Sequence, residues 1–186
     1  MMVSNVKNAK NAKNDKHGLK VIKKDIRKLW KSGEIVCVTI NGYVKKDGSA
    51  VMERGNALAM ADMIPELPHR LGEYLKTAGL KVGFFYERII AFPVKPKSCP
   101  IDHALADVRY LYINSSSVPG YHCKASVELI SKSAKELVEL AKTMADKNIY
   151  LPLPGIGNGG LSIQDIFSSI SVLYEASNIV LVKFTK

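Results

Sequence analysis

The sequence predicts an α/β fold in which helices cover both faces of a mixed, largely parallel sheet. From residue 17 onward, short apolar runs alternate with longer amphipathic ones, the pattern of a three-layer α/β/α arrangement. Two apolar runs flank Phe85-Tyr-Glu-Arg88 so closely that no helix can intervene, which predicts one antiparallel hairpin. Hydrophobic residues make up 47% of the 186 residues, which is enough to bury a substantial core.

The individual elements follow from the same periodicities. Strands are expected at residues 19–23, 34–40, 81–85, 88–92, 148–151 and 179–184. Helices are expected at residues 54–63, 67–77, 126–146 and 163–176. The helix at 126–146 has the clearest signal, because apolar residues between Val127 and Ala141 recur at helical spacing and form one stripe. Such a stripe indicates a face buried in the core.

Two segments fall outside this alternation. Residues 1–17 repeat Asn-Ala-Lys without apolar periodicity and are predicted to be a disordered basic tail, which leaves residues 18–186 as one domain. A stretch at about residues 96–123 has scattered polar residues and is expected to be a long loop, in which residues 108–113 can form one more short strand. Long loops in compact domains are usually functional lids or disordered segments.

The formal net charge of +10 favours polyanionic partners, nucleic acid among them. Part of this excess positive charge lies in the predicted tail, so the net charge alone is a weak guide to the partners of the protein. No apolar run reaches the length of a membrane span, and the N-terminus lacks the hydrophobic segment of a signal peptide. We therefore expect a soluble, cytoplasmic protein that does not bind membranes, and we expect a monomer.

The cysteines and histidines predict neither a disulfide framework nor a metal site. Cys37, Cys99 and Cys123 are widely spaced and odd in number, so reduced thiols are expected. Cys37 lies in an apolar run and is interpreted as a core residue, whereas Cys99 and Cys123 flank the long loop and matter only if they are close in space. No histidine pair has metal-ligand spacing near a carboxylate, so we expect no metal and no cofactor.

A glycine-rich loop, Leu151-Pro-Leu-Pro-Gly-Ile-Gly-Asn-Gly-Gly-Leu161, follows a predicted strand and precedes a predicted helix. Glycines allow backbone N–H groups to approach a phosphate closely, so the loop is interpreted as a diphosphate cradle. It lacks the Lys-Ser/Thr ending of a P-loop and the glycine spacing of the dinucleotide fingerprint. A simple Pro/Gly turn is the alternative. A second glycine-bearing loop at residues 39–57 also joins a strand to a helix, and together the two favour a nucleotide ligand.

These motifs resemble the macrodomain family. Asn41 followed by Gly48-Ser-Ala-Val-Met-Glu-Arg-Gly-Asn-Ala57 is similar to the first ligand loop of macrodomains, and residues 152–161 are similar to the second. The resemblance implies binding of ADP-ribose, with the first loop near the distal ribose, the second around the diphosphate, and Asp25 accepting from the adenine amino group. The implied ligand-binding positions are Asp25, Ile26, Asn41, Val51, Met52, Arg54, Gly55, Pro154, Gly155, Ile156, Gly157, Asn158, Gly159, Gly160 and Leu161.

A further motif, Ile89-Ile-Ala-Phe-Pro-Val-Lys95, is similar to a strand of DNA ADP-ribosyl glycohydrolases of the DarG type and of related stand-alone macrodomains. In that branch, and in terminal ADP-ribose protein glycohydrolases, a lysine near this position is implicated in attack on the distal ribose. The resemblance therefore implies that Lys95 is catalytic. A partly desolvated lysine can supply a free amine nucleophile. A solvated lysine at a strand end is the alternative interpretation, and for Asn41 the alternative is a turn residue.

Two departures from the family pattern affect the expected activity. Glu53 stands where many relatives have glycine, and the second loop lacks the aspartate that assists the lysine in the protein-specific hydrolase. The expected function is recognition of ADP-ribose or an ADP-ribosylated macromolecule, with possible hydrolysis of a link to nucleic acid or protein through Lys95. The alternatives are a non-catalytic reader or sequestering protein and a phosphatase acting on ADP-ribose 1″-phosphate.

Overall fold

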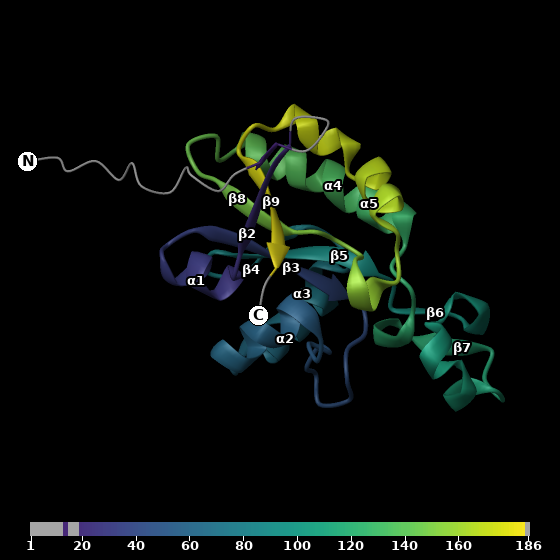
Figure 1. Ribbon diagram of the computed structural model, residues 1–186. Coiled ribbons are helices and arrows are strands. Elements are labelled where there is room, and N and C mark those ends of the chain that lie inside the picture. The colour runs from purple at the N-terminus through teal and green to yellow at the C-terminus, as the bar shows by residue number, and fades with distance from the viewer. Residues whose placement is uncertain (1–12, 15–18, 185–186) are drawn as a thin grey trace, which may run out of the picture.

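The computed structural model describes residues 13–14 and 19–184, and their central element is a mixed sheet (Figure 1). In spatial order its strands are β1 (Lys13–Asn14), β2 (Lys20–Lys24), β9 (Ile179–Phe184), β8 (Ile149–Pro152), β3 (Ile35–Asn41), β5 (Ile89–Lys95) and β4 (Gly83–Tyr86). The strands from β2 to β5 in this order run parallel, and β1 and β4 are antiparallel at the two edges. The predicted mixed, largely parallel sheet is thus confirmed.

Helices cover both faces of the sheet, as Figure 1 shows. One layer contains α1 (Ile26–Lys31), α2 (Gly55–Met63) and α3 (Leu67–Ala78), and the other contains α4 (Val127–Lys142), α5 (Ile163–Ser169) and the 3-10 helix η5 (Ser171–Glu175). Side chains alternate along a strand, so β5 sends Ile89 and Ala91 into the first layer and Ile90 and Phe92 into the second. Every residue of β5 is buried, which is typical of a strand covered on both faces.

Local capping explains where the helices begin and end. Ser126 caps α4 by accepting from the Leu129 N–H, and Ser162 and Asp165 form a capping box at the start of α5. The helix predicted at 163–176 is broken at Ile170, next to Ser169, whose Oγ donates to the Ile166 carbonyl at 2.8 Å. The short helix α1 was not predicted, because six residues are too few to show a period, although Asp25 caps it by accepting from the Arg27 N–H.

Helix α4 ends at Lys142, before the predicted end at residue 146. The Asn178 side chain hydrogen-bonds to carbonyl groups at this end and in the turn that follows it. The Asn178 Nδ2 donates to the carbonyl oxygens of Ala141, Met144 and Lys147 at 3.0–3.1 Å. We predict that Asn178→Ala lowers the free energy of unfolding by about 1–3 kcal/mol, because the variant leaves partly buried carbonyl groups unpaired. Urea denaturation measures the change, and Asn148→Ala provides a comparison in the neighbouring loop. A difference below about 0.5 kcal/mol would contradict this role.

The long loop expected at about 96–123 is a small structured insert that projects from the body (Figure 1). Strands β6 (Ser98–Pro100) and β7 (Ser117–Pro119) pair in it, and three 3-10 helices accompany them: η1 (Ile101–His103), η2 (Ala106–Tyr112) and η3 (Gly120–His122). The additional strand considered at 108–113 is wrong, because η2 occupies residues 106–112. A disulfide joins Cys99 to Cys123, so the expectation of reduced thiols is also wrong for this pair. Cys37 is a free, buried core residue, as predicted.

The disulfide closes a segment with a sequence separation of 24 residues. We predict that replacing both Cys99 and Cys123 with serine lowers the free energy of unfolding by about 3 kcal/mol, because the open chain gains conformational entropy when it unfolds. Denaturant unfolding with and without a phosphine reductant measures the effect. The reductant should shift the parent to the stability of the double variant and leave the variant itself unchanged. A parent that does not respond to the reductant would contradict the prediction.

Most of the predicted tail lies outside the described residues, except for Lys13–Asn14, which pair with β2. In the described part of the chain, no helix is both long and apolar enough to cross a membrane. The same residues contain no group of three or more His, Cys, Asp or Glu side chains that could hold a metal ion.

Candidate functional site

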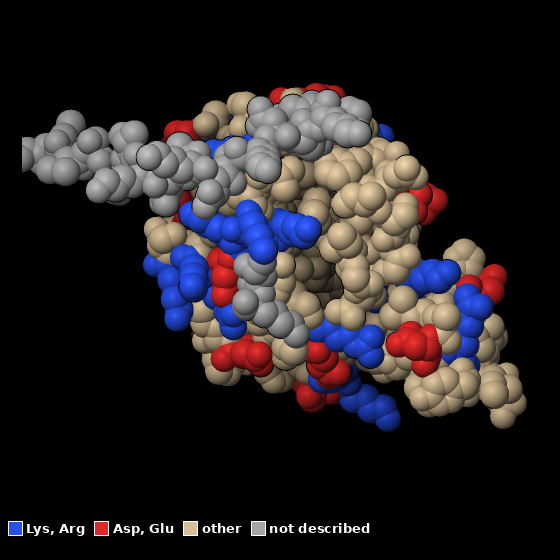
Figure 2. Space-filling view, in the orientation of Figure 1, with Lys and Arg blue, Asp and Glu red and all other residues tan. Residues whose placement is uncertain are grey.

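A cavity of about 390 Å³ opens at the carboxyl ends of β3, β5, β8 and β9. Ligands of open parallel sheets commonly bind at this edge, because the loops that follow neighbouring strands converge there. Figure 2 shows this face hollowed near its centre, with lysine and arginine side chains beside the hollow. The lining residues come from strand ends, two loops and the insert: Thr39, Ile40, Asn41, Val51, Glu53, Arg54, Gly55, Asn56, Ala57, Val94, Lys95, Tyr121, His122, Pro152, Leu153, Gly155, Ile156, Gly157, Asn158, Gly159, Val182, Lys183 and Phe184.

The first loop is held in shape by its own asparagines. The Asn41 Nδ2 donates to the Val51 carbonyl at 3.0 Å, and the Asn41 Oδ1 accepts from the Tyr43 N–H at 2.9 Å. The Asn56 side chain accepts from the Thr39 N–H and donates to the Thr39 Oγ1. Asn41 lines the cavity, and its amide also closes the turn that the alternative interpretation proposed.

The start of α2 offers unpaired donors to the cavity. Its N-cap residue, Arg54, makes no side-chain capping bond, and among the described residues the N–H groups of 55–57 have no backbone acceptor. These three residues all line the cavity. A helix N-terminus carries a partial positive charge and favours an anion. Nearby, Glu53 is paired with Lys45 at 2.8 Å, so its negative charge is balanced.

The glycine-rich second loop presents a further row of donors. Within the described part of the chain, the N–H groups of residues 155–158 donate to no protein group, and all four residues line the cavity. Gly155 has a φ of 80°, which side chains rarely adopt, and a Cβ there would lie 2.8 Å from the Leu161 Cδ1. This glycine is therefore required by both conformation and packing. Consecutive N–H groups of this kind can bind a phosphate.

Lys95 lies at the end of β5, with its side chain between the second loop and the insert. The strand register shifts between Ile40 and Asn41, so that Lys95 pairs with Asn41. The Lys95 Nζ donates to the Asn158 carbonyl at 2.8 Å and to the Tyr121 carbonyl at 3.3 Å. The residue is only 8% exposed. Burial, with a smaller effect of the Arg54 charge, lowers the pKa of Lys95 to about 8.

The insert contributes two aromatic residues that the sequence analysis did not include. Tyr121 and His122 both line the cavity. The Tyr121 ring contacts Tyr43 of the first loop with centroids 5.1 Å apart, and it contacts His122 at 4.5 Å. The signal for their position is Pro119-Gly120: a Cβ on Gly120 would lie 1.9 Å from the Pro96 carbonyl oxygen, so glycine is needed for the chain to return to the end of β5.

The sixteen site residues predicted from the sequence fall into two groups. Ten of the sixteen line the cavity, and these are Asn41, Val51, Arg54, Gly55, Lys95, Gly155, Ile156, Gly157, Asn158 and Gly159. Six do not, and these are Asp25, Ile26, Met52, Pro154, Gly160 and Leu161. Ile26 and Met52 are buried in the core. Asp25 instead binds Arg27, whose hydrogen bond holds the pKa of the Asp25 carboxyl below its ordinary value.

Asp25 nevertheless lies beside the cavity. It directly follows Lys24, which pairs with the cavity-lining Phe184 of β9. By contrast, Asp102 and His103 lie on the insert with exposed side chains, and the Asp102 Oδ2 lies 3.6 Å from the His103 Nε2. Neither residue lines the cavity.

No protein-family model and no curated protein matches this chain. Solved structures do match. The macrodomain of Thermus aquaticus DarG is 18% identical with a TM-score of 0.60, over 89% of this chain and 97% of that one. The macrodomain of Mycobacterium tuberculosis DarG is also 18% identical, with a TM-score of 0.51 over 79% of this chain and 86% of that one.

A third match is Thermosipho africanus DarTG in complex with ADP-ribose, at 16% identity and a TM-score of 0.61. The match covers 88% of this chain but only 40% of the DarTG chain, so this chain corresponds to less than half of that protein. At such identities, structural similarity establishes the fold, and the sheet order and the two helical layers agree with it. The chain has the macrodomain fold, as its resemblance to macrodomains and to the DarG branch predicted.

Proposed function

We propose that this protein binds ADP-ribose, or a close derivative, in the cavity and hydrolyses an ADP-ribosyl link through Lys95. The observation that carries the proposal is Lys95 itself, a buried lysine with a lowered pKa that lines the cavity. The DarTG structure of similar fold was solved in complex with ADP-ribose, which supports the choice of ligand.

The cavity has donors suited to each part of ADP-ribose. The free N–H groups of residues 155–158 fit the diphosphate, and those at the start of α2 fit the distal ribose and its neighbouring phosphate. Phe184 of β9 also lines the cavity, and we assign the adenine to the part of the cavity beside this apolar residue. Asp25 follows the strand residue that pairs with Phe184, and it can accept from the adenine amino group at that border.

The hydrogen bonds of Lys95 suit a neutral amine that acts as a nucleophile. Its two acceptors are both backbone carbonyls, Asn158 and Tyr121. A neutral amine has two N–H bonds and one lone pair, so two carbonyl partners use both donors and leave the lone pair for an electrophile. With a pKa of about 8, roughly a tenth of the lysine is neutral at pH 7. The distal C1″ carbon of an ADP-ribosyl group is the electrophile that we assign to it.

ADP-ribosylated nucleic acid is the macromolecular substrate that we favour over protein. The Phe-Pro-Val-Lys95 motif and the net charge of +10 support this choice. Lysine and arginine side chains also border the hollow in Figure 2, where a phosphate backbone extending from the cavity would meet them. Such binding depends on salt concentration, because it releases counterions.

A specific observation also supports a second candidate, a non-catalytic reader of ADP-ribose. Among the cavity-lining residues, Glu53 is the one carboxylate, and it is paired with Lys45. A hydrolase that needs a second acidic group would not find one there. In a reader, Lys95 would stay protonated and bind the diphosphate.

Calorimetric titration with ADP-ribose tests the proposed binding, and an assay of ADP-ribosylated DNA, ADP-ribosylated protein and ADP-ribose 1″-phosphate tests the reaction. We expect binding and release of ADP-ribose from DNA. Binding without turnover of any substrate would favour the reader, and phosphate release would indicate the phosphatase. A parent protein that does not bind ADP-ribose would overturn the proposal as a whole.

A further inference from the structure

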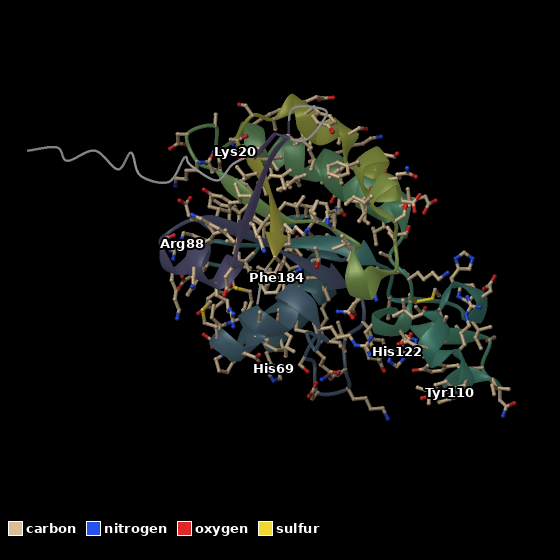
Figure 3. All side chains as sticks on the ribbon, in the orientation of Figure 1. Lys20, His69, Arg88, Tyr110, His122 and Phe184 are labelled. Atoms are coloured by element: carbon tan, nitrogen blue, oxygen red, sulfur yellow. A yellow bond between two sulfur atoms is a disulfide. The ribbon has the colours of Figure 1, made fainter. Side chains whose placement is uncertain are left out.

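The insert brings a histidine into the cavity that holds Lys95. His122 is the last residue of η3 and lines the cavity together with Lys95. Figure 3 shows His122 on the side of the insert nearest the body, whereas Tyr110 lies at its far tip. The function proposed above assigns no role to this imidazole.

Several contacts fix the position of this histidine. Its Nδ1 lies 2.9 Å from the Tyr112 Oη, and its ring packs edge-on against Tyr121. Its carbonyl accepts from the Leu105 N–H at 2.9 Å, and the next residue, Cys123, is tied to Cys99 by the disulfide. The ring is thus oriented through one nitrogen, which leaves Nε2 as the nitrogen that can act on a bound ligand.

His122 is also close to Lys95. The Lys95 Nζ donates to the Tyr121 carbonyl, which belongs to the peptide bond directly preceding His122. Burial lowers the pKa of His122, and the positive charges of Arg54 and Lys95 lower it further, while Asp107 and Glu53 act in the opposite direction. The rings of Tyr112 and Tyr121 also pack against the imidazole. Because the pKa of His122 lies below the ordinary value of 6.5, the imidazole is predominantly neutral at pH 7 and able to accept a proton.

We propose that His122 is the acid–base catalyst of the reaction at Lys95. The proposal rests on the hydrolase function inferred above. The Lys95 nitrogen forms a bond to C1″, and the bond from C1″ to the leaving atom breaks with its electron pair on that atom. The proton that faced the Tyr121 carbonyl passes to the His122 Nε2 and then to the leaving atom. The products are ADP-ribosyl-lysine and the protonated leaving group.

In the second step the water oxygen forms a bond to C1″ and the bond from C1″ to the Lys95 nitrogen breaks, while one proton of the water passes through the His122 Nε2 to that nitrogen. This step releases ADP-ribose and regenerates the amine. This assignment requires the tautomer in which the His122 Nδ1–H donates to the Tyr112 Oη, so that Nε2 can accept. Tyr112 is accordingly a positioning residue that fixes the tautomer and the orientation of the ring.

The test compares two substrates that differ in whether the leaving group must be protonated. One is a DNA oligonucleotide with ADP-ribose linked to a base, and the other is ADP-ribose linked at C1″ to 4-nitrophenol, which leaves readily as an anion. His122→Asn keeps a hydrogen-bonding amide near Tyr112 but cannot transfer the proton. We expect it to slow release from the oligonucleotide by at least about a hundredfold and release of 4-nitrophenol by less than about fivefold.

His103→Asn is the matched control, because His103 lies on the same insert with an exposed side chain and is absent from the cavity lining. It should behave as the parent with both substrates. Calorimetry of ADP-ribose binding should give the same affinity for the parent and for His122→Asn. Equal losses on both substrates with weakened binding would indicate a merely structural role and would overturn the proposal.

The outcomes separate this proposal from the function on which it rests. A parent that cleaves the oligonucleotide, with a His122→Asn variant that cleaves it equally fast, would overturn the role of His122 alone. A parent that cleaves neither substrate would overturn both. If the variant does not fold, the solvent deuterium isotope effect on the rate of the parent decides. The proposal requires this isotope effect to be larger for cleavage of the oligonucleotide than for cleavage of the 4-nitrophenyl substrate.

Discussion

Replacing Lys95 with alanine is expected to slow release of the ADP-ribosyl group by roughly a thousandfold or more, because the reaction loses its nucleophile. Binding of ADP-ribose should change by less than about tenfold, since most donors in the cavity are backbone N–H groups. A gel assay of ADP-ribosylated DNA measures the rate, and calorimetry measures the affinity. Turnover by Lys95→Ala at the parental rate would contradict the assignment.

Lys97→Ala is the matched control. Lys97 follows two residues later, is exposed and is absent from the cavity lining, so its loss should leave turnover near the parental value. Lys95 also joins the second loop to the insert through two carbonyls, so thermal unfolding of Lys95→Ala is needed to show that the variant remains folded.

The pH dependence of the parent gives an independent test of the same residue. Burial favours the neutral amine, so the Lys95 pKa lies at about 8 instead of the ordinary value of 10.5. Turnover that requires the free amine is therefore expected to rise with pH and to level off above about 8. A profile of kcat/KM against pH measures it. In a reader that uses the ammonium, ADP-ribose affinity would instead fall as pH rises through the same range.

Gly159→Glu is expected to weaken ADP-ribose binding by at least about a hundredfold. Gly159 lines the cavity within the second loop and is absent from the positions with positive φ, so the backbone accepts a side chain there. A new carboxylate about 4 Å from a phosphate charge costs on the order of 4 kcal/mol at an effective dielectric constant of 20. Calorimetric titration with ADP-ribose measures the loss.

The variant Gly159→Gln separates the effect of the added charge on ADP-ribose binding from the effect of the added side-chain volume. A Cβ at this position would lie 3.1 Å from the Ala125 Cβ in either variant, so both share the same steric cost. Glutamine should retain considerably more affinity than glutamate, and raising the salt concentration should narrow the difference. If the two variants bind ADP-ribose equally well, the diphosphate does not lie beside this loop.

The sequence predicted the sheet and both helical layers well, because their signals are local. The apolar runs of β3 and β5 arise because these strands are buried on both faces, and the apolar stripe of α4 arises because one face of this helix is buried. The glycine loop was also recognisable, since its residues need conformations or close contacts that only glycine permits, as at Gly155. These features require no knowledge of distant parts of the chain.

The insert was not predictable in the same way. Its stability depends on the Cys99–Cys123 bond and on a small apolar cluster around these cysteines, both of which join residues far apart in sequence. Tyr121 and His122 reach the cavity because Gly120 packs against the end of β5, a contact that no periodicity encodes. Likewise, the pairing of Asp25 with Arg27 depends on how α1 begins, and α1 itself was too short to detect.

The complete burial of β5 has a consequence for motion in the site. Lys95 is carried by a strand that is covered on both faces, paired with β3 as far as Lys95 and with β4 at residues 89–91, so the backbone amides of this strand should be among the slowest to exchange with solvent. The loops around residues 53–57 and 155–158 have unpaired amides and should exchange quickly. Ligand binding should therefore slow exchange in these loops and leave β5 unchanged, so that the nucleophile stays still while its surroundings become ordered.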